Sequence, residues 1–169
     1  KAKKIAAVML AATMTLSLAA CGGSSSSDSK SADGASDSGK VYKIGICQQL
    51  EHEALDQATK GFEDACEEKF GKDNVTFDLQ NGQGEQANCA TIANNFVADN
   101  VDLIMANATT ALQCSAAATS DIPILGTSIT DYATALDISD WTGATGMNIS
   151  GTSDLAPIDK QEEMLTELV

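Results

Sequence analysis

From residue 40 onward, short apolar segments alternate with longer segments in which apolar residues recur every three or four positions. Apolar or alternating runs of about four to eight residues are typical of strands, and the longer spacing is typical of helices. This pattern predicts strands over residues 41–47, 75–80, 101–106, 122–127 and 143–149. It predicts helices over residues 51–70, 84–100, 109–119 and 132–136.

The regular alternation of strands and helices determines the expected fold class. Each strand–helix–strand unit forms a right-handed crossover, so successive strands lie parallel in one sheet with helices on its faces. We therefore expect an α/β domain with a doubly wound parallel sheet over residues 40–152. Its length of about 110 residues is ordinary for one domain.

The last part of the chain, residues 153–169, contains one more amphipathic helix. After Pro157 the apolar positions form a stripe made by Met164, Leu165, Leu168 and Val169. No other segment of the sequence is predicted to cover that stripe, so it indicates a missing packing partner. We expect residues 153–169 to be a hinge and the first helix of a second lobe that this chain lacks.

The beginning of the chain has the pattern of a secretory signal peptide over residues 1–20, with three lysines followed by an apolar run. That run is shorter than the roughly 20 residues that a membrane-spanning helix needs. Residues 18–22 resemble the bacterial lipobox, in which the cysteine is diacylated and the chain is cut just before it. The resemblance implies lipidation of Cys21; the alternative is a plain secretory signal with an incidental cysteine.

Residues 21–39 consist mainly of Ser, Asp, Gly and Ala, with almost no apolar side chain. Such a segment buries too little surface to offset the entropy of ordering it. We expect a flexible linker between a lipid anchor and the folded domain. Two acyl chains on one cysteine would hold the protein at the membrane more stably than a single chain.

The chain is strongly acidic, with 24 Asp and Glu against 10 Lys and Arg and a formal net charge of −14. Nucleic-acid binding depends on Lys and Arg contacts to phosphate, so no nucleic-acid partner is expected. Electrostatic binding to anionic lipid is disfavoured for the same reason. We interpret the acidity as a source of solubility.

Four of the five cysteines lie in the predicted domain, at Cys47, Cys66, Cys89 and Cys114. An exported protein could pair them in disulfides. We favour buried apolar thiols, since the predicted positions are one strand and three helix interiors. No CxxC spacing occurs and His52 is the sole histidine, so no metal site is expected.

The first strand is not followed by the motif of a nucleotide-binding enzyme, and the motifs of a hydrolase do not occur. Residues 45–50, which follow the first strand, contain neither GxGxxG nor a P-loop. Neither a GxSxG elbow nor a Ser-His-Asp arrangement occurs, and His52 is the only candidate general base. We expect no catalytic residue and no cofactor; a flavodoxin-like enzyme is a minor alternative because fold does not fix function.

Ligands of open parallel sheets bind beyond the carboxyl ends of the strands. Three predicted loops meet that condition, over residues 48–54, 107–110 and 127–131. Amides at the helix starts suit a carboxylate, and hydroxyls can donate to the same anion. These hydroxyls belong to Thr109, Thr110, Thr127 and Ser128. Asp131 could pair with an ammonium group, so the lobe could bind an amino acid.

Helix capping is an alternative interpretation of several of these residues. Thr109, Ser128 and Asp131 are of types that favour N-caps. His52 is equally consistent with an exposed residue in a first helical turn. Trp141, in the loop before the last predicted strand, is expected to pack on the edge of the lobe rather than to stack on a ligand.

Several segments resemble the ABC-transporter substrate-binding family that includes tryptophan- and tyrosine-binding lipoproteins. They are residues 44–46, 49–56, 77–84, 101–104, 122–124 and 127–131, together with a hinge-like segment at 153–161. The resemblance implies a two-lobed periplasmic-binding-protein fold that closes on a small solute. Where this family often has a Thr-Pro pair after the third strand, the chain has Thr109 and Thr110.

The resemblance also implies a function and partners. The expected protein is an extracytoplasmic, lipid-anchored monomer that binds a small solute, an aromatic or other apolar amino acid, for the permease subunits of an ABC importer. An alternative is a receptor of the same fold that reports to a membrane sensor. The candidate ligand-binding residues are Glu51, His52, Ala54, Leu55, Asn107, Ala108, Thr109, Thr110, Thr127, Ser128, Asp131 and Asp154.

Overall fold

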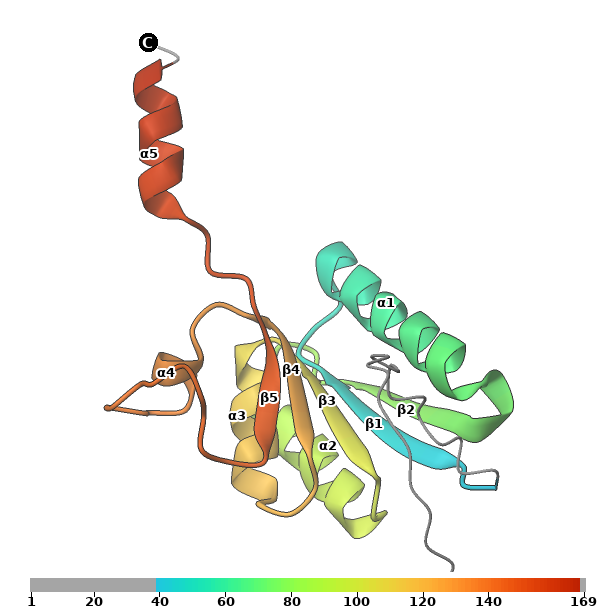
Figure 1. Ribbon diagram of the computed structural model, residues 1–169. Helices are drawn as coiled ribbons and strands as arrows, with labels where there is room; N and C mark the ends of the chain where they lie inside the picture. Colours follow the sequence, from blue (N-terminus) through green and yellow to red (C-terminus); the bar gives the residue numbers. More distant parts are fainter. Residues whose placement is uncertain (1–38, 168–169) are drawn as a thin grey trace, which may run out of the picture. The chain divides into compact units, whose positions relative to one another are not determined.

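Five parallel strands form a single sheet in the order β2-β1-β3-β4-β5 (Figure 1). The computed structural model describes residues 39–167, so the predicted signal peptide, Cys21 and nearly all of the predicted linker lie outside the described residues. The strands are β1 (Tyr42–Gln48), β2 (Val75–Asn81), β3 (Leu103–Asn107), β4 (Ile124–Ile129) and β5 (Ile149–Ser153). The prediction of an α/β fold with a parallel sheet is confirmed.

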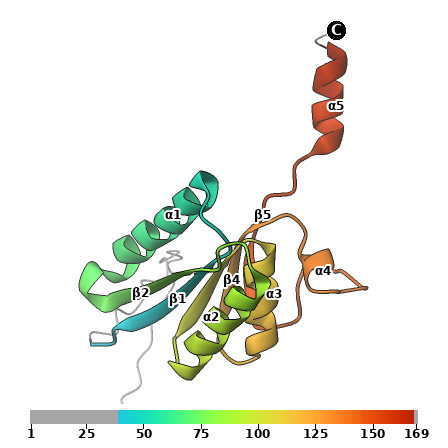
Figure 2. The same cartoon turned by 180° about the vertical axis from the view of Figure 1, so that it is seen from behind.

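Helices cover both faces of the sheet. The helices are α1 (Glu53–Phe70), α2 (Gln86–Ala98), α3 (Thr109–Ala118), α4 (Tyr132–Ala135) and α5 (Ile158–Glu167), with a 3-10 turn η1 at Lys72–Asn74. Helix α1 lies on one face, and α2 and α3 lie on the other, as the two opposite views show (Figure 2). This two-sided cover is why β1 and β3 are buried along most of their length rather than at alternate positions.

Each face of the sheet has its own apolar core. On the side of α2 and α3, Phe96 packs directly on Gly45, where an added Cβ would lie 2.6 Å from a ring carbon. The core on the side of α1 is smaller and contains Ile44, Ile46, Cys66, Val75 and Met105. Each fully buried Ile, Leu or Phe contributes about 1.5–3 kcal/mol, so these two cores stabilise the sheet.

The four cysteines of the domain are buried free thiols, as the sequence predicts. Cys47 lies on β1, and burial raises the pKa of its thiol well above the ordinary value. Cys89 and Cys114 lie on α2 and α3 in the same core. Within residues 39–167, no three His, Cys, Asp or Glu side chains are grouped so that they could hold a metal ion.

The predicted strand over residues 143–149 is wrong in position, because β5 spans Ile149–Ser153. Gly143 and Gly146 have φ angles of +89° and +69°, outside the range of extended strands. The chain becomes extended where Ile149 pairs with Ile124 of β4. After this first residue β5 is exposed and polar, so the strand carries no apolar pattern that a sequence could reveal.

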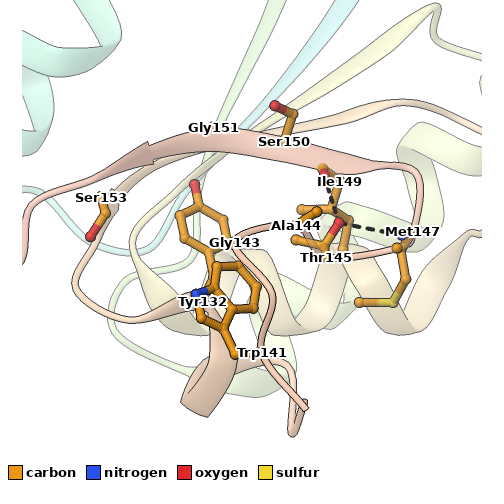
Figure 3. A pocket seen from close by; sticks show the side chains of 11 residues that line it. Tyr132, Trp141, Gly143, Ala144, Thr145, Met147, Ile149, Ser150, Gly151 and Ser153 are labelled. Atoms are coloured by element: carbon orange, nitrogen blue, oxygen red, sulfur yellow. Dashed lines mark hydrogen bonds between the residues drawn. The ribbon is translucent and has the colours of Figure 1, made fainter. Parts of the chain in front are cut away.

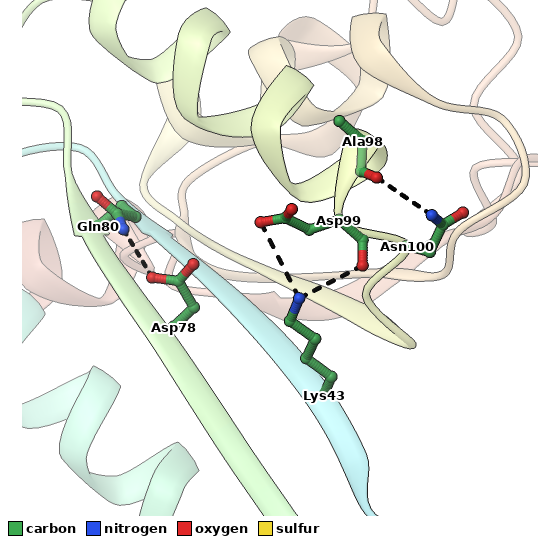
Figure 4. A network of polar contacts seen from close by, with 6 residues as sticks. All are labelled: Lys43, Asp78, Gln80, Ala98, Asp99 and Asn100. Atoms are coloured by element: carbon green, nitrogen blue, oxygen red, sulfur yellow. Dashed lines mark hydrogen bonds and ion pairs between the residues drawn. The ribbon is translucent and has the colours of Figure 1, made fainter.

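Charged pairs occupy the opposite end of the sheet, near the amino ends of the strands. The Lys43 ammonium donates to the Asp99 carbonyl oxygen at 3.4 Å and lies 4.0 Å from its carboxylate (Figure 4). Lys40 and the backbone amide of Lys43 hydrogen-bond to Asp102 and hold the pKa of its carboxyl below the ordinary value. Exposed pairs of this kind contribute about 0–1 kcal/mol.

Helix α5 buries none of its described residues. Its apolar side chains Ile158, Met164 and Leu165 are all exposed, so the stripe predicted from the sequence is uncovered in the described part of the chain. No helix within residues 39–167 combines the length and apolar character needed to cross a membrane.

Candidate functional site at the carboxyl ends of the strands

The carboxyl ends of β1, β3 and β4 lie next to one another. Gln48 at the end of β1 pairs with Asn107 at the end of β3, which pairs with Thr127 of β4. The three loops predicted to form a ligand site therefore leave the same edge of the sheet (Figure 1). We call this the carboxyl edge; in open parallel sheets it is where ligands bind.

Two residues other than glycine have positive φ angles at the carboxyl edge. Ala108, between β3 and α3, has φ +83° and ψ 162°, and Ser128 of β4 has φ +57°. The Ala108 amide donates to the Thr127 carbonyl oxygen at 3.0 Å, and the β4–β5 pairing shifts register between Gly126 and Ile129. Such backbone strain costs about 1–3 kcal/mol per residue and is concentrated at binding and catalytic sites.

The amino end of α3 presents free donors at this edge. Ala108 is the N-cap, and no side chain of a described residue caps the helix. The Thr110 amide donates to Oε1 of Gln49 at 3.1 Å, whereas in the described part of the chain the amides of Thr109 and Ala111 have no acceptor. Because a helix start also carries partial positive charge, this end of α3 is suited to a carboxylate.

His52 is the N-cap of α1. Its Nδ1 accepts a hydrogen bond from the Ala54 amide at 3.2 Å, and the side chain is exposed. The structure therefore agrees with the interpretation of His52 as an exposed residue at a helix start. Glu51 beside it is also exposed, while Leu55 in the first turn is half-buried.

Asp131 caps the short helix α4. Its carboxylate accepts from the Thr134 hydroxyl at 2.6 Å and from the Ala133 amide at 2.9 Å, and these bonds hold its pKa below the ordinary value. The group is exposed and stays ionised at neutral pH. Asp154 follows β5, and its amide donates to the Ile129 carbonyl oxygen at 3.0 Å, so its exposed side chain lies at the same edge.

The predicted site residues differ in their exposure. Asn107 is fully buried, and the half-buried residues are Leu55, Ala108, Thr109, Thr110, Thr127 and Ser128. The exposed ones are Glu51, His52, Ala54, Asp131 and Asp154. Gln49 and Thr152 also lie at the carboxyl edge but are not among the predicted residues; Thr152 is found only once the register of β5 is known.

A hollow of about 490 Å³ opens beside the carboxyl edge, between α1 and the end of β2. Gln48, Glu51 and Asn81 line it at the strand ends. Its other lining residues are Asp56, Thr59, Lys60, Glu63 and Leu79. The hollow therefore leaves room for a small molecule beside the ends of β1 and β2, whereas the residues at the amino end of α3 are not among its lining.

A second hollow, of about 450 Å³, lies beside the edge strand β5 (Figure 3). Tyr132, Trp141 and Met147 contribute its large side chains. The Tyr132 hydroxyl already donates within the protein, to the carbonyl oxygens of Gly126 at 2.9 Å and Thr152 at 3.2 Å. None of the described residues that line this hollow belongs to a helix start with free amides, so the carboxyl edge is the better candidate for an anionic group.

The comparisons with known proteins agree on one protein family. Residues 43–169 match the family described as ABC transporter substrate binding protein. A tyrosine-binding protein from Clostridioides difficile (strain R20291) is 39% identical over 171 residues, which cover 99% of this chain and 49% of that protein. The chain therefore spans about half the length of this relative.

Solved structures agree in fold. A ligand-free, open substrate-binding protein with adhesive properties from Clostridium difficile has a TM-score of 0.69 and 41% identity, covering 75% of this chain and 43% of that one. An ABC domain in complex with L-Trp from Streptococcus pneumoniae has a TM-score of 0.68 and 36% identity, with the same coverage of 75% and 43%.

Proposed function

The chain belongs to the family of ABC transporter substrate-binding proteins, as its motifs predict, and from this premise we propose that it forms the first of two lobes of an amino-acid receptor. The role of this family is binding rather than catalysis, so the chain is not an enzyme. In the proposed protein, one solute molecule lies between the lobes at the carboxyl edge, and closure about a hinge presents it to a permease.

The amino end of α3 is the observation that carries this proposal. The free amides of Thr109 and Ala111, beside the strained Ala108, form an anion site made of backbone donors. The hydroxyls of Thr109 and Thr110 add donors to the same group. We assign this place to the carboxylate of the solute.

The ammonium group of an amino acid needs an anionic partner at the same edge. Asp131 and Asp154 are exposed carboxylates there, and Glu51 lies on the neighbouring loop. Asp131 keeps its charge down to acidic pH because its pKa is lowered. A tyrosine-binding protein and a structure holding L-Trp among the relatives support an aromatic amino acid as the solute.

The location and partners in this proposal follow from the sequence. A lipid on Cys21 would hold the receptor outside the cell membrane, residues 21–39 would serve as its linker, and permease subunits of an ABC importer would receive the solute. Substitution Cys21→Ser tests the anchor. We expect the variant to be released from the membrane fraction; a variant that stays there as firmly as the original would contradict lipidation at this residue.

A thermal-shift series on the full-length protein that carries this chain tests the proposed solute class. A solute at 100 times its Kd stabilises the folded state by about 2.7 kcal/mol. We expect tyrosine, tryptophan or another apolar amino acid to raise the melting temperature while acidic and basic ones do not. If none of the twenty amino acids raises it, the amino-acid assignment is wrong.

A further inference from the structure

A buried polar network joins β1, α1 and β3 directly beneath the carboxyl edge. The Thr59 hydroxyl donates to Oε1 of Gln48 at 2.7 Å and accepts from Nδ2 of Asn107 at 3.0 Å. The exposed fractions of Gln48, Thr59 and Asn107 are 4%, 3% and 0%. We call these three residues the Gln48–Thr59–Asn107 network.

Side chains of the network also hydrogen-bond to the loop between β1 and α1 and to the first turn of α1. Nε2 of Gln48 donates to the Leu50 carbonyl oxygen at 2.9 Å and to the Asp56 carboxylate at 2.6 Å. Nδ2 of Asn107 donates to the Leu55 carbonyl oxygen at 2.8 Å. Both ends of residues 50–56, the segment that contains Glu51 and His52, are therefore fixed by side chains of neighbouring strands.

The orientation of Asn107 shows which of its bonds matter. Its Oδ1 is buried and has no hydrogen-bond partner among residues 39–167, and an unpaired buried acceptor lowers stability. Turning the amide over would place that oxygen against the Leu55 carbonyl oxygen, which can only accept. In the observed orientation the Asn107 side chain makes both hydrogen bonds through Nδ2, and its Oδ1 is left unpaired.

A second link connects the same loop to α3. Oε1 of Gln49 accepts from the Thr110 amide at 3.1 Å, and the Gln49 amide donates to the Asn107 carbonyl oxygen at 3.1 Å. Residues 49–56 are therefore tied to the strand that leads into the proposed carboxylate site. A displacement of one loop would displace the other.

We propose that the Gln48–Thr59–Asn107 network positions the β1–α1 loop relative to the amino end of α3, so that both contact one solute at a fixed spacing. This inference rests on the proposed function of the carboxyl edge. Asn107 and Thr59 act as positioning residues: their side chains are almost completely buried, and they act through residues 50–56 and through α3. Pre-organised contacts of this kind raise affinity because less freedom is lost on binding.

Thr59→Val in the full-length protein is the test, because valine keeps the shape of threonine and removes both of its hydrogen bonds. We expect amide hydrogen exchange across residues 50–56 to be about tenfold faster, since local opening becomes easier. We expect the affinity for the amino acid identified by thermal shift to fall about tenfold. Thr59→Ser keeps the hydroxyl and should restore both values.

Ile92→Val, which removes one methylene from the core on the opposite face, is the matched control for general destabilisation. It should lower the melting temperature without changing exchange at residues 50–56 or affinity. Unchanged exchange or unchanged affinity in Thr59→Val would overturn the positioning role. If the original protein binds no amino acid, the proposed function fails, and the exchange comparison shows separately whether the network orders the loop.

Discussion

The hydroxyl oxygens of Thr127 and Thr152 lie 3.5 Å apart, on neighbouring strands β4 and β5 at the carboxyl edge. Either hydroxyl can donate to the other, so one hydrogen of the pair is left for a third group. The two hydroxyls add hydrogen-bond donors to the free amides at the amino end of α3. It also brings β5, a polar edge strand, into the proposed binding surface.

Substitution Thr127→Val removes one of these hydroxyls without changing the shape of the side chain. We expect solute affinity in the full-length protein to fall by about 1 kcal/mol, the usual contribution of a neutral hydrogen bond. Calorimetric titration measures this. Thr76→Val on β2, at the other end of the sheet, is the control and should leave affinity unchanged; equal losses in the two variants would argue against a role for Thr127.

Ala108 occupies a backbone conformation that is suited to glycine, with φ +83°. Ala108→Gly should therefore stabilise the protein by about 1 kcal/mol, because the strain of the side chain is relieved. Ala117→Gly, at an exposed position in α3, should destabilise it by about 1 kcal/mol. Urea unfolding of both variants checks this, and a loss of stability in Ala108→Gly would mean that the turn is not strained.

Gly151 lies where β5 passes close to β4 and to Tyr132. An added Cβ would lie 2.1 Å from both the Gly126 carbonyl oxygen and the Tyr132 hydroxyl oxygen. Gly151→Ala should lower the free energy of unfolding by about 1–3 kcal/mol, as overpacked positions do. Gly61→Ala in α1 meets no atom within 4 Å and should raise it by about 0.5–1 kcal/mol. Thermal unfolding separates the two, and equal effects would contradict this packing of β5.

Asp131 makes stability depend on pH in the acid range. The pKa of its carboxyl is lower in the folded protein, chiefly because of the hydrogen bond from the Thr134 hydroxyl. The contribution of Asp131 to the free energy of unfolding is therefore complete above the ordinary pKa of about 3.9, and it is lost as the pH falls through the lowered pKa. Thr134→Val removes that hydroxyl. We expect the variant to lose less stability than the original protein between neutral and strongly acidic pH, as measured by unfolding at a series of pH values. If the free energy of unfolding of both proteins falls equally with pH, the Thr134 hydroxyl does not lower the pKa of Asp131.

The sequence predicts the sheet, its order of elements and the three loops, because apolar periodicity is a local property. The sequence pattern misplaces β5, because the position of this strand is decided by pairing with β4 and its residues after Ile149 are polar or glycine. The sequence does not reveal the Gln48–Thr59–Asn107 network, because its members come from three different elements of the chain. Asn107 and Thr59 are 48 positions apart, and no spacing in the sequence connects them.

Backbone amide NMR on the full-length protein, titrated with the amino acid that stabilises it, tests most directly whether the solute binds at the carboxyl edge. We predict that the amide resonances of Thr109 and Ala111 shift on binding, while the indole N–H resonance of Trp141 beside β5 does not. A shift at Trp141 with no change at Thr109 and Ala111 would place the solute in the hollow beside β5 and contradict the proposed site.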